Sequence, residues 1–220
     1  VYEGNETATI TLSNATKASI SDSTGTLTIT DDESAPTVTL TSSASSVAEN
    51  GSALTLTATL SGATDEAVTV GISTSGTGTE GTDYATVSDI TISAGATTGT
   101  TSFTVTDDSI YEGNETGIIA IDTVSGGGGS GATENGTQAV TITITENDSG
   151  PTVTLTSSAS SIAENAGSSL TLTATLASAT IADVTVTFSY TGTATRNGTD
   201  YANVSNIVIS AGDTTGRCWK

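Results

Sequence analysis

The chain has no histidine, no methionine, one cysteine and only 4 lysine and arginine residues among 220. Without histidine it lacks the usual general base of enzymes and the commonest ligand of transition metals. The single Cys218 excludes an intrachain disulfide, and the missing histidine excludes the usual nucleophilic triads. Two carboxylates would suffice for a glycosidase, but aromatic residues form 4% of the chain and offer almost no platform for sugars. We therefore predict that the chain is not an enzyme.

Positive charge is scarce: 24 aspartate and glutamate residues against 4 lysine and arginine residues give a formal charge of −20. This charge predicts no nucleic-acid partner and no anionic membrane surface. The chain has no run of 18 apolar residues, so we predict no direct membrane insertion. Its acidic, Thr/Ser/Gly-rich composition favours an extracellular or cell-surface location. Residue 1 lies inside a repeated segment, so we read the chain as a piece of a longer protein or a processed product.

Long segments of the chain occur more than once. Residues 1–7 return at 110–116 with Val1 replaced by Ile110, residues 36–50 return at 151–165 with Val47 replaced by Ile162, and residues 81–85 return unchanged at 198–202. Such a period predicts tandem domains. We assign a complete copy to 36–148, partial copies to 1–33 and 151–216, and an unmatched tail to 217–220.

Apolar residues alternate with threonine along nearly the whole chain, which predicts half-buried antiparallel strands. The complete copy holds seven strands, A to G, starting near residues 37, 53, 67, 88, 100, 115 and 138. This number and length predict an all-β fold of tandem immunoglobulin-like β-sandwiches. The first copy has only strands F and G, and the third has A to D, with strand E missing. Alignment with the first copy predicts that Ile119 and Ile121 face inward and that Ile118 faces outward. Tyr84 and Tyr111 are predicted to be core or corner anchors.

The offset between copies grows from 109 to 115 residues, which locates a six-residue insertion in the F–G loop of the complete copy. Residues 125–131 read Ser-Gly-Gly-Gly-Gly-Ser-Gly, and we expect this loop to be flexible.

Strand direction gathers the acidic segments of the complete copy at one end. Strands A, C, E and G run the same way, so the A–B, C–D and E–F loops and the end of G share a pole. Eight carboxylates are predicted there: Glu49, Asp83, Asp107, Asp108, Glu112, Glu115, Glu146 and Asp148. Two like charges near 4 Å cost about 4 kcal/mol at an effective dielectric of 20. Either the groups splay into water or a hard cation lies among them. Oxygen donors on loops suit Ca²⁺, whereas Zn²⁺ would need His or Cys.

The sequence resembles the Calx-β domain through Val-Ala-Glu-Asn at 47–50, Gly-Thr-Asp-Tyr at 81–84, Asp-Asp-Ser-Ile-Tyr-Glu-Gly-Asn-Glu at 107–115 and Ile-Thr-Glu-Asn-Asp at 144–148. That family includes calcium-sensing domains of sodium/calcium exchangers and tandem modules of large bacterial surface and adhesive proteins. The resemblance implies Ca²⁺ as the cofactor. It maps the ligands onto the eight carboxylates above and onto further acids of the partial copies: Glu3, Glu6, Asp31, Asp32, Glu33, Glu164 and Asp200. The neutral Asn147 departs from the acidic ending of the family's domains, which predicts weaker calcium binding by the complete copy, the second of the three.

These observations predict an extracellular structural or adhesive repeat segment of a larger surface protein, with Ca²⁺ at the inter-domain pole stiffening the array. The short Pro-containing junctions 34–36 and 149–151 limit the freedom between copies. The expected partners are neighbouring repeats, further copies of the chain, and a cell-surface or matrix ligand. The alternative is a self-assembling filament subunit, in which the incomplete terminal sandwiches complement each other head to tail.

Overall fold

The computed structural model describes residues 1–163, 167, 169–198 and 200–219. Within these residues the regular secondary structure is entirely β-strand, and no helix is long and apolar enough to cross a membrane. The chain forms two compact units. Unit 1 contains Val1–Asp107 and Asn114–Thr145, and unit 2 contains Asp108–Gly113 and Glu146–Lys220.

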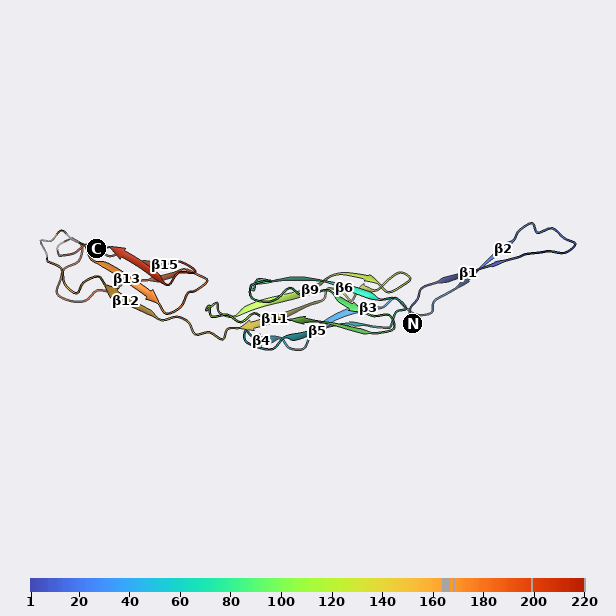
Figure 1. Cartoon of the computed structure of the whole chain (residues 1–220), viewed down its shortest axis with the longest axis horizontal. Helices are drawn as coiled ribbons and strands as arrows, with labels where there is room; N and C mark the ends of the chain where they lie inside the picture. The colour runs from blue at the N-terminus through green and yellow to red at the C-terminus, as the bar shows by residue number, and fades with distance from the viewer. Residues whose placement is uncertain (164–166, 168, 199, 220) are drawn as a thin grey trace. The chain divides into compact units, whose positions relative to one another are not determined.

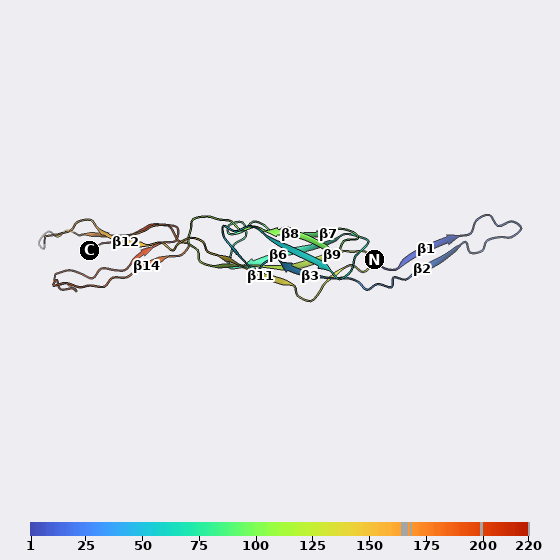
Figure 2. The same cartoon turned by 90° about the horizontal axis from the view of Figure 1, so that it is seen from below.

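Unit 1 contains a two-sheet sandwich, which confirms the predicted immunoglobulin-like fold (Figures 1 and 2). One sheet has the order β10 (Thr133–Glu134), β3 (Thr37–Ser42), β5 (Leu54–Leu60) and β8 (Thr98–Phe103). The other has the order β4 (Ser46–Ala48), β11 (Ala139–Thr145), β9 (Glu115–Gly126), β6 (Val68–Gly76) and β7 (Ile90–Ile92). The seven predicted strands are present, and their starts lie within two residues of the predicted positions.

Strand A is divided between the two sheets, which the sequence reading did not anticipate. Its first half, β3, pairs antiparallel with β5, and its second half, β4, pairs parallel with β11. The break falls in the run of small polar residues 42–46, where the alternation of apolar and polar residues stops and the Ser42 hydroxyl donates to the Ala44 carbonyl. The crossing brings the segment after β4, which begins at Glu49, beside the end of β11.

Alternation along the strands builds the core, because every second side chain faces the opposite sheet. Val38, Leu56, Val70 and Phe103 are fully buried, while the threonines that alternate with the apolar residues of these strands are half-buried or exposed. Ile119 is fully buried, Ile121 is 8% exposed and Ile118 is only half-buried, as the comparison of copies predicts. Tyr84 is buried against Phe103, with ring centroids 4.8 Å apart, which confirms it as a core anchor.

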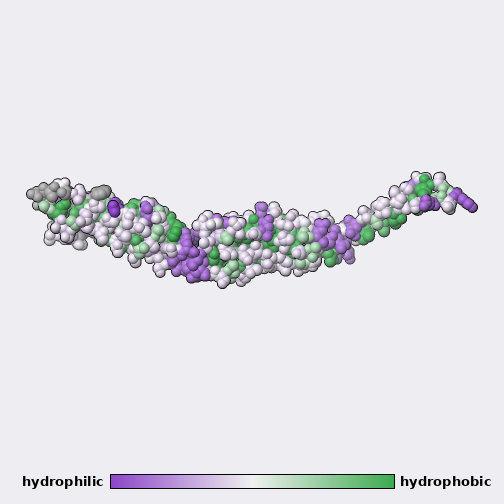
Figure 3. Space-filling view, viewed as in Figure 1, coloured by the Kyte–Doolittle hydropathy of each residue, from purple (hydrophilic) through white to green (hydrophobic). Residues whose placement is uncertain are grey.

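The first partial copy is a two-stranded antiparallel ribbon of β1 (Glu6–Thr11) and β2 (Thr24–Ile29), and Figures 1 and 2 show no second sheet over it. All residues of both strands are exposed. The large apolar side chains Ile10, Leu12, Leu27 and Ile29 are 53–63% exposed, and apolar surface along the ribbon is visible in Figure 3.

Unit 2 contains a three-stranded sheet, β12 (Val153–Ser157), β13 (Thr171–Leu176) and β16 (Thr215–Trp219), and a two-stranded sheet, β14 (Val184–Val186) and β15 (Ile207–Ile209). Strand β16 corrects the prediction that strand E is missing. It pairs with β13 as β8 pairs with β5, with Gly216 opposite Ala174 and Gly99 opposite Ala58.

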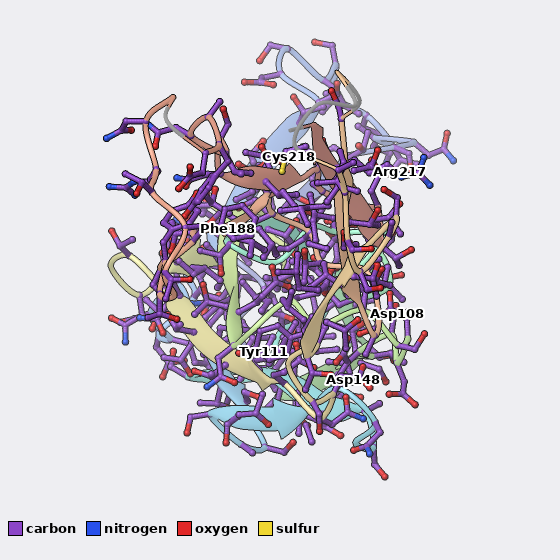
Figure 4. All side chains as sticks on the ribbon, turned by 90° about the vertical axis from the view of Figure 1, so that its left-hand side faces the viewer. Asp108, Tyr111, Asp148, Phe188, Arg217 and Cys218 are labelled. Atoms are coloured by element: carbon purple, nitrogen blue, oxygen red, sulfur yellow. The ribbon has the colours of Figure 1, made fainter. Side chains whose placement is uncertain are left out.

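The residues after Gly216 differ in sequence from the complete copy but keep the alternation of a strand. Arg217 is exposed, and Cys218 is 8% exposed within the core of Ala174, Leu176, Ile207 and Ile209; Figure 4 labels both on β16. A backbone ladder does not depend on side-chain identity, and a free cysteine packs as a small hydrophobe. The strand therefore forms although the sequence motif is lost.

Candidate metal site

The structure brings nine of the fifteen predicted metal ligands into three groups. Within each group, one carboxylate oxygen per residue lies within 4.8 Å of the others. The groups are Asp31, Asp32 and Glu33; Glu49, Glu146 and Asp148; and Asp83, Glu112 and Glu115. Five predicted ligands, Glu3, Glu6, Asp107, Asp108 and Asp200, belong to no such group in the described part of the chain. Glu164 lies outside the described residues.

Glu49 is the most buried carboxylate of the second group, with 6% of its surface exposed. Its backbone N–H donates to the Thr145 carbonyl at 3.0 Å, which continues the parallel pairing of β4 with β11 by one residue. The split of strand A therefore fixes the position of Glu49 immediately beside the end of strand G. Burial of a carboxylate close to other carboxylates is costly unless a cation or hydrogen bonds compensate it.

The first acid after strand G holds the backbone of the Tyr-Glu-Gly segment. In unit 2, Glu146 Oε2 accepts hydrogen bonds from the N–H groups of Glu112 and Gly113 at 2.6 and 2.8 Å. Its Oε1 accepts one from the Asp148 N–H at 2.8 Å. We call this arrangement the carboxylate latch. Gly113 has a φ of +82°, which suits a turn that directs two successive N–H groups at one anion.

The same latch occurs in the first copy, within unit 1. Asp31 Oδ2 accepts from the N–H groups of Glu3 and Gly4, and Asp31 Oδ1 accepts from the Glu33 N–H at 2.9 Å. Gly4 has a φ of +81° and so matches Gly113 of the complete copy. Aspartate in one copy and glutamate in the other thus perform the same task.

Hydrogen bonding keeps both latch residues ionised. The backbone N–H groups of Glu33, Glu3 and Gly4 hold the pKa of Asp31 well below its ordinary value. Partial desolvation would raise the pKa of Glu146, but the N–H groups of Asp148, Glu112, Gly113 and Asn147 together outweigh it and lower the pKa. Both groups therefore carry a full negative charge at neutral pH.

Asp83 is positioned by the turn that follows β6. Its Oδ2 accepts a hydrogen bond from the Thr79 N–H at 2.6 Å, and its own N–H donates to the Thr79 carbonyl at 2.9 Å. It is 8% exposed, next to the fully buried Tyr84, and shares the third group with Glu115 at the start of β9. Asp200 accepts a bond from the Thr195 N–H in the corresponding turn of the third copy, but it is exposed.

The predicted ligands outside the groups lie on more open parts of the chain. Asp108 accepts a hydrogen bond from the Ile110 N–H at 2.7 Å and shapes the turn before Tyr111; Figure 4 labels Asp108, Tyr111 and Asp148. Glu3, Glu6 and Asp107 are exposed. Tyr111 is 39% exposed and its ring lies 3.7 Å from where a Cβ of Gly150 would be, so it is not buried in a core.

The donor set of the three groups consists only of carboxylate oxygens. Such a set fits a hard divalent cation, and loop-borne carboxylates that can bind through one or both oxygens fit Ca²⁺ in particular. It does not fit the tetrahedral nitrogen and sulfur sites of structural zinc. The sequence reading missed the latch, although the repeated Glu-Gly dipeptide with its required positive-φ glycine was a usable signal.

Comparison with known proteins gives one family. The family model described as Calx-beta domain matches residues 31–148 and 146–220. No curated protein sequence gave a significant match. Among solved structures, an apo-form Calx CBD1 domain aligns with 51% of this chain and 99% of its own at 20% identity and a TM-score of 0.43. The CBD12 structures from CALX1.2 and CALX1.1 each align with 79% of this chain and 70% of their own, at 21% and 18% identity and TM-scores of 0.42 and 0.41.

Proposed function

Because the chain belongs to the Calx-beta domain family, we propose that its acidic groups bind Ca²⁺ and that the bound ions stiffen a tandem array of sandwiches. The observations that carry this proposal lie within unit 1. Glu49 and Asp83 are only 6% and 8% exposed, and the carboxylate oxygens of Asp31, Asp32 and Glu33 lie within 4.8 Å of one another. Ca²⁺ is the group that these residues would hold. When bound, it would neutralise their mutual repulsion.

The residues of this chain supply the positioning. Split strand A holds Glu49 beside strand G, the latch holds Glu146, and the turn at 79–84 holds Asp83. A preformed set of oxygens loses less conformational entropy on binding. The role is structural: a cation between loops from separate strands restricts their motion relative to one another.

The parent protein is proposed to act outside the cell or at its surface, as a structural or adhesive repeat protein. An excess of 20 negative charges and a threonine-covered outer face support this setting, since they favour solubility and discourage contact with nucleic acid and anionic lipid. Its expected partners are neighbouring repeats and a cell-surface or matrix ligand.

Calcium titration of the whole chain tests the metal proposal. We expect saturable heat of binding by isothermal titration calorimetry, and a change in the small-angle scattering curve when EGTA is replaced by Ca²⁺. Glu49→Gln should abolish or strongly weaken this binding. Asp122→Asn, which removes one charge from an exposed position outside the three groups, should leave it intact. Equal calcium affinity in both variants, or scattering that does not respond to the ion, would contradict the proposal.

Self-assembly by strand complementation is the second candidate function. The β1–β2 ribbon has strands F and G and exposes four large apolar side chains. In unit 2, β14 pairs only with β15 among the described strands, whereas its counterpart β6 also pairs with strand F, β9. A depression of about 330 Å³ lined by Phe188, Tyr190 and Tyr201 lies beyond β14. The ribbon of one molecule would supply the strands F and G that the described part of unit 2 in another molecule does not have.

Sedimentation of the 220-residue chain at increasing concentration, with electron microscopy of the product, tests assembly. We expect association that rises with concentration and is reduced by Leu27→Thr with Ile29→Thr, which keep β propensity but remove apolar surface. A monomer at every concentration would eliminate this candidate.

A further inference from the structure

Tyr2 is buried in the complete sandwich although it belongs to the preceding copy. Only 7% of its surface is exposed. Its N–H donates to the Ala63 carbonyl at 3.1 Å, and its carbonyl accepts from the Asp65 N–H at 3.2 Å, so that it forms a parallel bridge with Thr64. The Tyr-Glu-Gly segment is therefore held by the turn between β5 and β6, which is the B–C turn of the complete copy.

The glycine-rich loop 125–131 contacts the hydroxyl group of Tyr2. The Ser130 N–H donates to the Tyr2 hydroxyl at 2.9 Å, and the Ser130 hydroxyl lies 2.5 Å from the same oxygen. The loop is also braced internally by bonds from the Gly131 N–H to the Gly128 carbonyl and from the Ala132 N–H to the Gly126 carbonyl. The loop that the glycine run marks as flexible in the sequence thus makes defined contacts with a residue of the preceding copy.

Glycine at position 129 is required by the approach of two backbones. A Cβ on Gly129 would lie 2.8 Å from the Gly4 Cα and 2.9 Å from the Tyr2 hydroxyl, and a Cβ on Gly4 would lie 2.5 Å from the Gly129 Cα. Backbone atoms cannot move aside as a side-chain end can. The loop is shaped to the segment that it contacts.

We propose that turn 61–65 and loop 125–131 form a docking socket for the Tyr-Glu-Gly segment of the preceding repeat, and that the six-residue insertion gives this socket its specificity. The socket's occupant here is residues 2–4. The first copy has a shorter F–G loop without the glycine run, so it cannot make the Ser130 contact. Loop length and composition then determine which repeat can follow which in an array whose Tyr-Glu-Gly segments are identical.

Comparison with the second Tyr-Glu-Gly segment distinguishes the contact that both segments make from the contact that only residues 2–4 make. Within unit 2, Tyr111 forms a parallel bridge with Thr180, as Tyr2 does with Thr64. Tyr111 is nevertheless 39% exposed against 7% for Tyr2, and the described residues of unit 2 include no counterpart of loop 125–131. The turn contact thus belongs to both copies, and the loop supplies the additional burial. None of the residues of turn 61–65 and loop 125–131 belongs to the three carboxylate groups.

Amide hydrogen exchange measured by NMR on the whole chain tests this inference. Tyr2→Phe removes the acceptor of the Ser130 N–H and should speed exchange at Ser130 by about tenfold. Gly129→Ala should expel the segment and speed exchange at Tyr2, Asp65 and Ser130 together. The controls are Tyr111→Phe, the equivalent residue of the other segment, and Gly25→Ala, which lies outside the socket and where an added Cβ meets nothing within 4 Å.

The expected pattern is the same in Ca²⁺ and in EGTA, which distinguishes this test from that of the metal proposal. Unchanged exchange at Ser130 in both Tyr2→Phe and Gly129→Ala would overturn the socket. The same would follow if Tyr111→Phe or Gly25→Ala accelerated exchange at Ser130 as much as the socket variants do, because the effect would then be nonspecific.

Discussion

Glu146 has two separable tasks, and replacing it should reveal both. As a latch it accepts three hydrogen bonds of 2.6–2.8 Å from the backbone N–H groups of Glu112, Gly113 and Asp148. As a ligand it is one of three carboxylates in its group. Hydrogen bonds to a charged acceptor contribute about 1.5–3 kcal/mol each, but at this partly exposed position the freed N–H groups regain water. We therefore expect Glu146→Ala to cost about 2–3 kcal/mol in EGTA.

For a domain of this size, such a loss lowers the melting temperature of unit 2 by roughly 10–20 °C. Glu146→Gln keeps one carbonyl oxygen as an acceptor and should lose about half as much. Ca²⁺ at about 100 times its dissociation constant should add about 2.7 kcal/mol to the wild-type chain and much less to either variant. Calorimetric melting with Asp122→Asn as the control measures both effects. Equal melting temperatures of wild type and Glu146→Ala in EGTA would refute the latch.

Three further outcomes follow from the contacts described above. The pKa values of Asp31 and Glu146 are lowered in the folded chain. Their contribution to stability is therefore complete above the unfolded pKa of about 4 and is lost as the pH falls through the folded value. Amide exchange at Gly4 and Gly113 should thus stay slow at pH 5 and accelerate only well below pH 4. Gly117→Ala places a Cβ 2.8 Å from the buried ring of Phe103 and should destabilise the sandwich by about 1–3 kcal/mol in urea unfolding, whereas Gly25→Ala, with open space around it, should not. Burial raises the pKa of the Cys218 thiol, so a thiol reagent at pH 8 should label it slowly in the native chain and rapidly in denaturant; fast native labelling would contradict the placement of β16.

The strands could be predicted because alternation records burial directly. Each apolar residue of 38–40, 54–60 and 68–70 that the period of two assigned to the inside is buried or half-buried. Comparison of copies added what one segment could not give, namely the inward orientation of Ile119 rather than Ile118. Strand β16 could not be predicted from the repeated motifs, because Arg217 and Cys218 preserve the alternation of exposed and buried residues but not the motif.

The acidic positions could be predicted only in part, because strand direction indicates which end of a sandwich a loop occupies but not which atoms meet there. Strand parity pointed to Glu49, Asp83 and Glu146, and each of them belongs to one of the three carboxylate groups. It could not separate Asp108, whose carboxylate is used by its own turn, from residues that face one another. Nor could it show that loop 125–131 contacts residues of another copy, since composition alone predicts flexibility for a glycine run.

The contacts of the latch reduce the importance of the neutral residue Asn147 for calcium binding by the complete copy. The first copy ends in Asp31-Asp32-Glu33 and the complete copy in Glu146-Asn147-Asp148. In each copy the first acid holds the Tyr-Glu-Gly backbone and accepts the N–H of the third residue, so the geometry requires an acceptor at the first position and only a backbone N–H at the third. The side chain of the middle residue is exposed in both copies. A neutral residue in the middle thus leaves the carboxylate acceptor of the latch and its backbone donors in place. Asn147→Asp should accordingly change calcium affinity far less than Glu49→Gln, and calorimetric titration of the two variants would show whether the flanking acids carry the site.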